Sequence, residues 1–170
     1  MGVDPGLLTT GYGVIEALGS KLCLVEGGVV HGGDSSLPVE ERLASLYSGI
    51  HEVLAVHNPQ ALALEELYSH YDHPTTAVLM GHARGAICLA AAHSGVPVFS
   101  YASTQVKSSL AGNGRATKAQ MQRAIQARLG LSHLPEPHDV ADALAIAVCH
   151  WQMSKVTDIL SRTLASTRKR

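Results

Sequence analysis

Residues 3–15 read VDPGLLTTGYGVI: a short apolar strand ends at Asp4, the chain turns through Pro5 and Gly6, and a second strand begins at Thr10. An aspartate that starts a turn is common, because its side chain hydrogen-bonds the backbone nearby. The same position also suits a metal ligand or a catalytic acid. The choice between these interpretations depends on whether other segments supply partners for Asp4.

The composition is that of one globular domain. The chain has 170 residues, of which 46% are hydrophobic and 16% are charged. We find no run of about 18 apolar residues, the length of a membrane span, and no signal-peptide pattern at the N-terminus. We therefore expect a cytoplasmic protein that does not enter a membrane.

The charges are divided unevenly along the chain. Residues 1–83 contain 2 basic and 10 acidic side chains, whereas residues 84–170 contain 11 basic and 4 acidic side chains. This division is compatible with an ordinary solvated surface. It also fits a protein that presents a basic face to a polyanion.

Strands alternate with helices after an initial hairpin, which predicts a mixed α/β sheet flanked by helices. The predicted strands are residues 3–4, 11–18, 21–31, 61–68 and 96–102, and the predicted helices are residues 38–56, residues 75–93, one from 118 and one from 137. The apolar runs 61–68 and 96–102 suit buried strands. Helix 75–93 is apolar almost all round, so a second subunit could cover the side that the sheet does not; simple packing on the sheet is the alternative.

Glu65 poses the same question as Asp4. It lies near the C-terminal end of an apolar strand, where a charge is costly unless it is paired or bound to a cation. Sheets of this class bind ligands beyond the carboxyl ends of their strands, so Asp4 and Glu65 can meet there. Glu66 alternates to the other side and serves as a structural control.

The segment PHDVADALAIAVCHW, residues 137–151, supplies two more carboxylates. Asp139 and Asp142 are three residues apart, so they share one edge of the first helical turn. Compensation of the helix dipole would be enough to explain them. Together with Asp4 and Glu65 they would form a cluster that repels itself without cations and whose oxygen atoms suit Mg²⁺ or Mn²⁺.

The segment GNGRATKAQ, residues 112–120, predicts a loop that enters a helix through a capping box of Thr117 and Gln120. Arg115 and Lys118 would then lie beside a helix N-terminus, which is a natural phosphate site. Lys107 lies upstream and could reach the same surface. The alternative is that these are solvated charges on a loop.

Three other side chains have less specific expectations. Tyr68 opens a polar loop and could stack on a base or cover the core. His138 and His150 flank the aspartate-bearing helix, and either could touch the site. The ten histidines show no zinc-binding spacing.

Five segments together resemble the RuvC-type Holliday-junction resolvases, a family with a ribonuclease-H-like fold. The matching segments are VDPGLLTTGYGVI, ALEELY, GHARGA, PVFSYASTQVKSSLAGNGRATKAQMQ and HDVADALAIAVCH. They span nearly the whole chain in the family order and with similar spacing. The resemblance implies a five-stranded mixed sheet whose first three strands are antiparallel. We expect the nuclease domain in residues 1–153 and a helical or disordered basic tail in residues 154–170.

The resemblance also implies roles for individual residues. The acidic metal-binding site would consist of Asp4, Glu65, Asp139 and Asp142. DNA contacts would come from Lys107 and Lys118 near the cleaved phosphates and from Tyr68 at the junction centre, and we add Arg115. Family members act as homodimers, and a branch-migration motor is a partner by resemblance only.

We therefore expect a magnesium-dependent endodeoxyribonuclease that resolves four-way DNA junctions in recombination and repair. Two Mg²⁺ ions per active site, replaceable by Mn²⁺, would support symmetric nicks that leave 5′-phosphate and 3′-hydroxyl ends. Three residues precede Asp4, fewer than is usual in the family. One alternative is thus a junction-binding protein whose short first strand allows little or no cleavage. Another is a nuclease of this fold that acts on RNA–DNA hybrids or other branched DNA.

Overall fold

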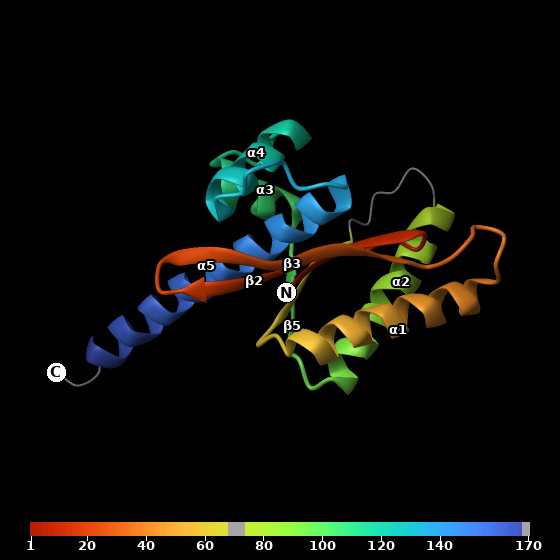
Figure 1. Cartoon of the computed structure of the whole chain (residues 1–170). Helices are drawn as coiled ribbons and strands as arrows, with labels where there is room; N and C mark the ends of the chain where they lie inside the picture. The colour runs from red at the N-terminus through yellow and green to blue at the C-terminus, as the bar shows by residue number, and fades with distance from the viewer. Residues whose placement is uncertain (68–73, 168–170) are drawn as a thin grey trace.

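The computed structural model describes residues 1–67 and 74–167, with side chains to residue 157 (Figure 1). The strands are β1 (Gly2–Asp4), β2 (Thr9–Leu18), β3 (Lys21–His31), β4 (Leu62–Glu65) and β5 (Val98–Tyr101). The helices in the described part are α1 (Val39–His57), α2 (Pro74–His93), α3 (Ser103–Ala111), α4 (Lys118–Leu129) and α5 (His138–Thr167).

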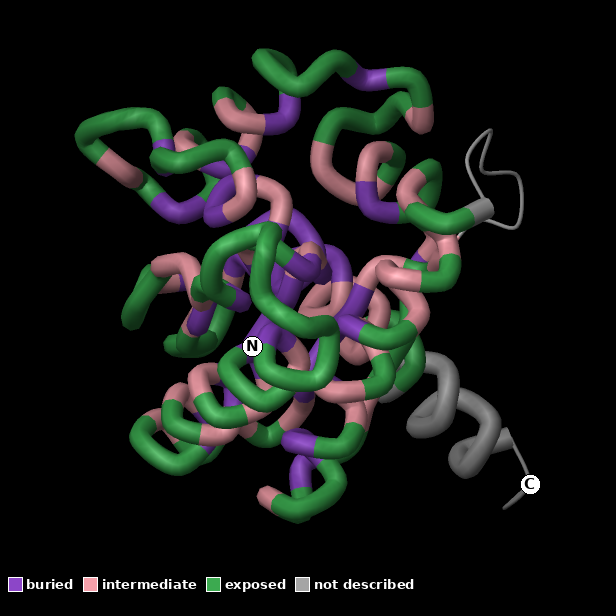
Figure 2. Tube along the Cα trace, turned by 90° about the vertical axis from the view of Figure 1, so that its right-hand side faces the viewer, coloured by how far each residue is buried: buried purple, intermediate pink, exposed green. Residues whose placement is uncertain are grey.

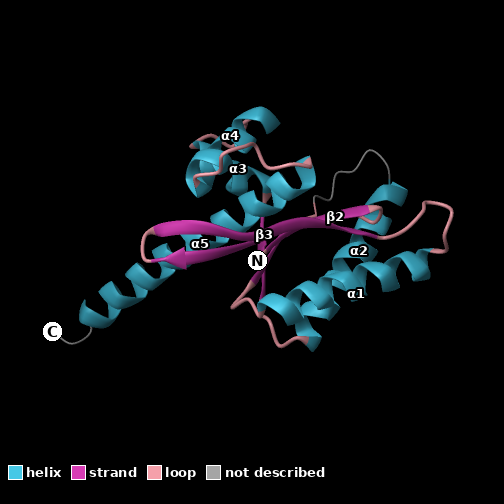
Figure 3. Ribbon diagram, in the orientation of Figure 1, coloured by secondary structure: helices cyan, strands magenta, loops and turns pink. Residues whose placement is uncertain are grey.

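The strands form one mixed sheet in the order β3-β2-β1-β4-β5. The first three strands are antiparallel, while β4 runs parallel to both β1 and β5. Helices α1 and α2 cover one face, and α3, α4 and α5 cover the other (Figures 1 and 3). The predicted α/β fold with a five-stranded mixed sheet is confirmed.

Strand β1 is short, but it is the central strand and is paired on both edges. Side chains alternate along a strand, so Val3 faces α1 and α2 while Gly2 and Asp4 face α5. Val3 is fully buried in the core that includes Leu46 and Ile87. The buried residues run through the middle of the molecule, and the outer helix turns are exposed (Figure 2).

Glycines on β1 and β2 allow α5 to lie directly on the sheet. A Cβ atom on Gly11 would stand 2.1 Å from the carbonyl oxygen of Asp139, and one on Gly2 would stand 2.1 Å from that of Ala143. A Cβ atom on Gly13 would likewise stand 2.5 Å from the Leu144 side chain. The backbone of α5 therefore packs against the backbone of the strands, which only residues without a side chain permit at this distance.

Three features differ from the sequence-based expectations. Helix α3 was not predicted. Strand β5 is not buried as expected, because it is the edge strand and Phe99 is 43% exposed. The strand predicted over residues 61–68 is shorter and ends at Glu65.

Helix α2 has an apolar side that is exposed in the described part of the chain. Residues Thr75–His93 are long and apolar enough, by length and composition, to cross a membrane, and 22% of that stretch is buried in the fold. The expectation that no stretch of this chain meets that test was therefore wrong. The helix nevertheless packs against α1, as a helix that flanks a core does. Its exposed side carries residues at alternating spacings of four and three: Val78, His82, Gly85, Leu89 and Ala92.

The contact between α5 and the sheet predicts the effect of Gly11→Ala. The added methyl group overlaps the Asp139 carbonyl, so we expect the free energy of unfolding to fall by about 2 kcal/mol or more. Urea denaturation measures this. Leu8→Ala, at a half-exposed position just before the same strand, should cost less than about 1 kcal/mol. Equal effects of the two substitutions would contradict the close packing.

Candidate active site

Two carboxylates end adjacent parallel strands. The register pairs Val3 with Leu64, so the next residues, Asp4 and Glu65, lie side by side. Neighbouring strands are about 4.8 Å apart, and the two side chains project to the same face. That face is the one covered by α5. The predicted meeting of Asp4 and Glu65 at the carboxyl ends of two strands therefore agrees with the register.

Helix α5 brings two further carboxylates to the same place. Gly11 is the partner of Asp4 in the antiparallel pair of β1 and β2, and the backbone of Asp139 lies against that glycine. Asp142 follows almost one turn later and, like Asp139, is half-buried. Three elements that are distant in sequence thus converge at one end of the sheet.

The pKa values in this cluster show that the carboxylate side chains interact. Burial raises the pKa of Asp4 to about 7, and the negative charges of Asp142, Glu65 and Asp139 contribute to the rise. Burial also raises the pKa of Glu65 and that of Asp142, again with neighbouring carboxylates contributing. Ionisation of the cluster is unfavourable unless positive charge is supplied.

Both lysines that were predicted to contact DNA, Lys107 and Lys118, lie near the carboxylates. The charge of Lys118 lowers the pKa of both Asp4 and Asp142, and the charge of Lys107 does the same for Glu65 and Asp142. Lys118 is exposed at the first turn of α4. The predicted capping box is present there, since Thr117 and Gln120 exchange hydrogen bonds of 2.8 and 3.3 Å.

The other candidate residues are less closely connected. Arg115 is exposed, and its backbone N–H donates to Asn113 Oδ1 at 2.9 Å. Tyr68 lies outside the described residues. His138 is 2.8 Å from Gln122 and close enough to Asp142 to lower the pKa of that aspartate. His150 instead contacts Tyr101 and Phe99, three turns further along α5.

Sequence reasoning missed two residues that contact Glu65. The polar side chain of Ser103 lies near the Glu65 carboxylate and lowers the pKa of Glu65. Arg84 of α2 donates to the backbone carbonyl of the same residue. The first contact has no signal in the sequence, because it depends on α3 beginning directly after β5. The residue of the second contact, Arg84, lies within the GHARGA segment, which carries part of the family resemblance but no predicted role for the arginine.

The donor set fits a hard divalent cation. Among the described residues, no three Asp, Glu, His or Cys side chains already stand where a single ion would hold them. The cluster nevertheless consists of carboxylate oxygens, the ligands that Mg²⁺ and Mn²⁺ prefer. The raised pKa of Asp4 shows that positive charge would be favourable at this point.

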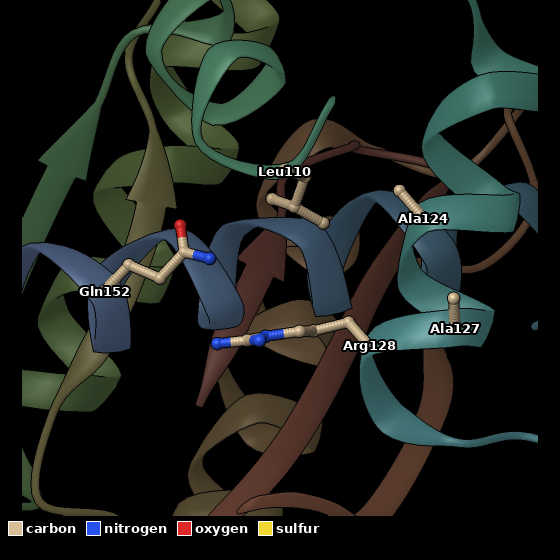
Figure 4. Close-up of a pocket in the computed structure, with 5 residues that line it drawn as sticks. All are labelled: Leu110, Ala124, Ala127, Arg128 and Gln152. Carbon is tan, nitrogen blue, oxygen red and sulfur yellow. The ribbon is translucent and has the colours of Figure 1, made fainter. Parts of the chain in front are cut away.

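Two recesses of the surface lie away from the carboxylate cluster. One recess of about 370 Å³ between α3, α4 and α5 is lined by Leu110, Ala124, Ala127, Arg128 and Gln152 (Figure 4). A larger groove of about 860 Å³ runs past Phe99 and Trp151. Neither is lined by any of the four carboxylates, which are half-buried at one end of the sheet.

A five-stranded mixed sheet with acidic residues at the ends of its central strands defines a protein of the ribonuclease-H-like class. The model of the family "Crossover junction endodeoxyribonuclease RuvC" matches residues 1–150. The relative from Rhodopirellula baltica with that name is 56% identical over 150 residues, which cover 88% of this chain and 83% of the relative.

Solved structures agree with this assignment. Thermus thermophilus RuvC is 38% identical, with a TM-score of 0.83 over 92% of this chain and 95% of that one. The structure of the same protein in complex with a Holliday junction substrate has a TM-score of 0.86, at 38% identity over 92% and 94%. The chain belongs to the RuvC family of crossover junction endodeoxyribonucleases, as predicted.

The raised pKa of Asp4 predicts how stability depends on pH. The folded state binds more protons than the unfolded state between pH 4 and pH 7, so the free energy of unfolding falls as pH rises through this range. In metal-free protein, we expect Asp4→Asn to stabilise the fold at pH 8 by on the order of 2 kcal/mol, after allowance for partial exposure. At pH 5 the gain should be smaller.

Urea denaturation in a chelating buffer at both pH values measures this difference. Glu66→Gln is the matched control, because Glu66 is exposed next to Glu65 and should show no such gain. A destabilising effect of Asp4→Asn at pH 8, or a gain that does not change with pH, would refute the electrostatic account.

Proposed function

We propose that this chain resolves four-way DNA junctions as a metal-dependent endodeoxyribonuclease. Its acidic site consists of Asp4, Glu65, Asp139 and Asp142. The observation that carries the proposal is the convergence of three other carboxylates on Asp4, whose pKa is about 7. Membership of the RuvC family supports the choice of substrate.

The proposed cofactor is Mg²⁺, two ions per active site, with Mn²⁺ as a substitute. When bound, the ions supply a water of lowered pKa for attack on phosphorus and positive charge for the leaving oxygen. The water oxygen joins the phosphorus, the bond to the 3′ oxygen breaks, and the products are a 5′-phosphate and a 3′-hydroxyl. Asp4 and Glu65 hold their oxygens at fixed positions on the central strands, and α5 brings Asp139 and Asp142 to them.

The proposed DNA contacts surround this cluster. Lys107 and Lys118 lie close enough to the carboxylates to alter their pKa values, so they can hold phosphates beside the cleaved bond. The exposed N-terminus of α4 adds backbone N–H groups and a positive dipole. Arg115 belongs to the same loop. Tyr68 remains a proposal from the sequence, at the junction centre.

A junction-binding protein without cleavage is not favoured. That alternative depended on a first strand too short to fix Asp4. Strand β1 is paired on both edges, and Val3 is fully buried. The backbone of α5 packs directly against Gly2. The three residues before Asp4 are therefore enough to anchor it.

The proposal also includes a homodimer that buries the exposed side of α2. Its residues repeat at spacings of four and three, as in helices that pack against a partner helix. Val78 and Leu89 are 56% and 51% exposed on this side, and Gly85 would let a second backbone approach. A branch-migration motor as partner and a cytoplasmic location are proposed from the family resemblance and the sequence alone.

Junction cleavage by the variant Asp4→Asn tests the proposed nuclease activity. We expect junction binding to persist and cleavage to fall by at least about 100-fold, because the ligand lost contributes several kcal/mol to the transition state. The assay compares a mobile four-way junction, an RNA–DNA hybrid and a linear duplex in Mg²⁺. Glu66→Gln should cleave the junction normally. Junction cleavage by Asp4→Asn at the wild-type rate, or preferential cleavage of the hybrid, would refute the proposal.

Leu89→Glu tests the dimer. A charge at the centre of the exposed side of α2 should weaken self-association by at least about tenfold, since burying an unpaired charge is costly. Sedimentation velocity over a concentration series measures the change. Val56→Glu places the same charge on the neighbouring helix α1, at a residue that is 70% exposed, and should leave association unchanged. A wild-type chain that is monomeric at all concentrations would contradict the proposal.

A further inference from the structure

Arg84 connects helix α2 to the ends of two strands. Its Nη1 donates to the backbone carbonyl oxygen of Glu65 at 2.5 Å, and its Nη2 donates to Ser100 Oγ at 2.5 Å. Glu65 is the last residue of β4 and Ser100 lies in β5. One side chain therefore holds the backbone of a proposed metal ligand and the neighbouring strand at the same time.

The Glu65 carbonyl needs such a donor because of the register of the sheet. Between β1 and β4, the amine of Met1 donates to Ala61 O at 3.0 Å, and the N–H of Ala63 donates to Met1 O at 2.8 Å. In a parallel ladder this pattern repeats every two residues. The donor to Glu65 O would then be residue 5, which is Pro5 and has no N–H.

An unpaired carbonyl at this position would leave Glu65 loosely held. On the β5 side, the N–H of Glu66 donates to Tyr101 O at 2.9 Å, so that edge is secured. On the β1 side the ladder stops at Pro5, and Arg84 supplies the missing hydrogen bond. The Ser103 side chain lies near the carboxylate and lowers its pKa. Arg84 thus acts on the backbone of Glu65, and Ser103 on its side chain.

We propose that Arg84 is a positioning residue: it replaces the ladder donor that Pro5 lacks and thereby holds Glu65 in place to bind the metal ion. The inference rests on the proposed function, in which Glu65 is a ligand. It differs from a DNA contact, because both terminal nitrogens of the guanidinium group are directed at the sheet. Residues that orient metal ligands typically contribute 10- to 100-fold to metal affinity.

Binding of Mn²⁺ to the DNA-free protein is the first test. We expect Arg84→Gln to weaken Mn²⁺ binding by about 10- to 100-fold, measured by calorimetry or by the spin resonance of free Mn²⁺. Arg84→Lys keeps one donor and should lose less. Ser100→Ala removes only the second acceptor, so its affinity should stay within about threefold of the wild type. Unchanged affinity in Arg84→Gln would overturn the proposal.

A second measurement separates positioning from folding and from DNA binding. With Ca²⁺ in place of Mg²⁺, Arg84→Gln should bind a four-way junction as tightly as the wild type, whereas its cleavage should need a higher Mg²⁺ concentration. Restoration of wild-type cleavage at saturating Mg²⁺ supports positioning. Weaker junction binding in Ca²⁺, or a cleavage defect that excess Mg²⁺ does not relieve, would overturn it.

The Mn²⁺ measurement keeps the two proposals distinguishable. If the wild type binds Mn²⁺ but does not cut junctions, the proposed function fails and the affinities of the Arg84 variants still decide the inference. If the wild type cuts junctions and Arg84→Gln binds Mn²⁺ normally, only the inference fails. Where Arg84→Gln does not fold, the comparison of Arg84→Lys with Ser100→Ala decides it.

Discussion

The direct packing of α5 on the glycines of β1 and β2 is the contact on which the rest of the structure depends. Gly2, Gly11 and Gly13 leave no room for a side chain beneath the helix. Because the backbones touch, the first turn of α5 reaches the end of β1, where Asp4 lies. The same contact places two cores on opposite faces of one short central strand. The site is therefore a product of the packing and needs no long loop to assemble it.

This arrangement stores electrostatic repulsion at one end of the sheet. Burial raises the pKa of Asp4, and the three neighbouring carboxylates raise it further. The hydrophobic cores on both faces maintain the fold despite this cost. Lys107 and Lys118 offset part of the repulsion, and a cation would offset more. Positive charge beside the four carboxylates lowers the cost of ionising them.

Pro5 affects both the end of β1 and the hydrogen bonding of Glu65 on the neighbouring strand. The proline follows Asp4 directly, where β1 ends. It also removes a donor from the ladder between β1 and β4. Arg84 reaches from α2 to the carbonyl left without a partner. The turn that follows one carboxylate, Asp4, is thus linked to the support of another, Glu65.

Much of this site could be predicted from the sequence, because charged residues at the ends of apolar strands are informative. Asp4, Glu65, Asp139 and Asp142 were predicted together, and so was the capping box before Lys118. The supporting contacts were not predictable. Ser103 lies in a helix with few apolar residues, and the role of Arg84 depends on a register that no local pattern encodes. The exposure of β5 was also missed, since an apolar run looks alike in central and edge strands.

The measurement that tests the account most directly is the location of Mn²⁺ in crystals of the protein, found by its anomalous scattering. The account predicts Mn²⁺ at the ends of β1 and β4, coordinated by oxygen atoms of Asp4 and Glu65 and of at least one of Asp139 and Asp142. Mn²⁺ bound elsewhere in a protein that cleaves junctions would contradict it.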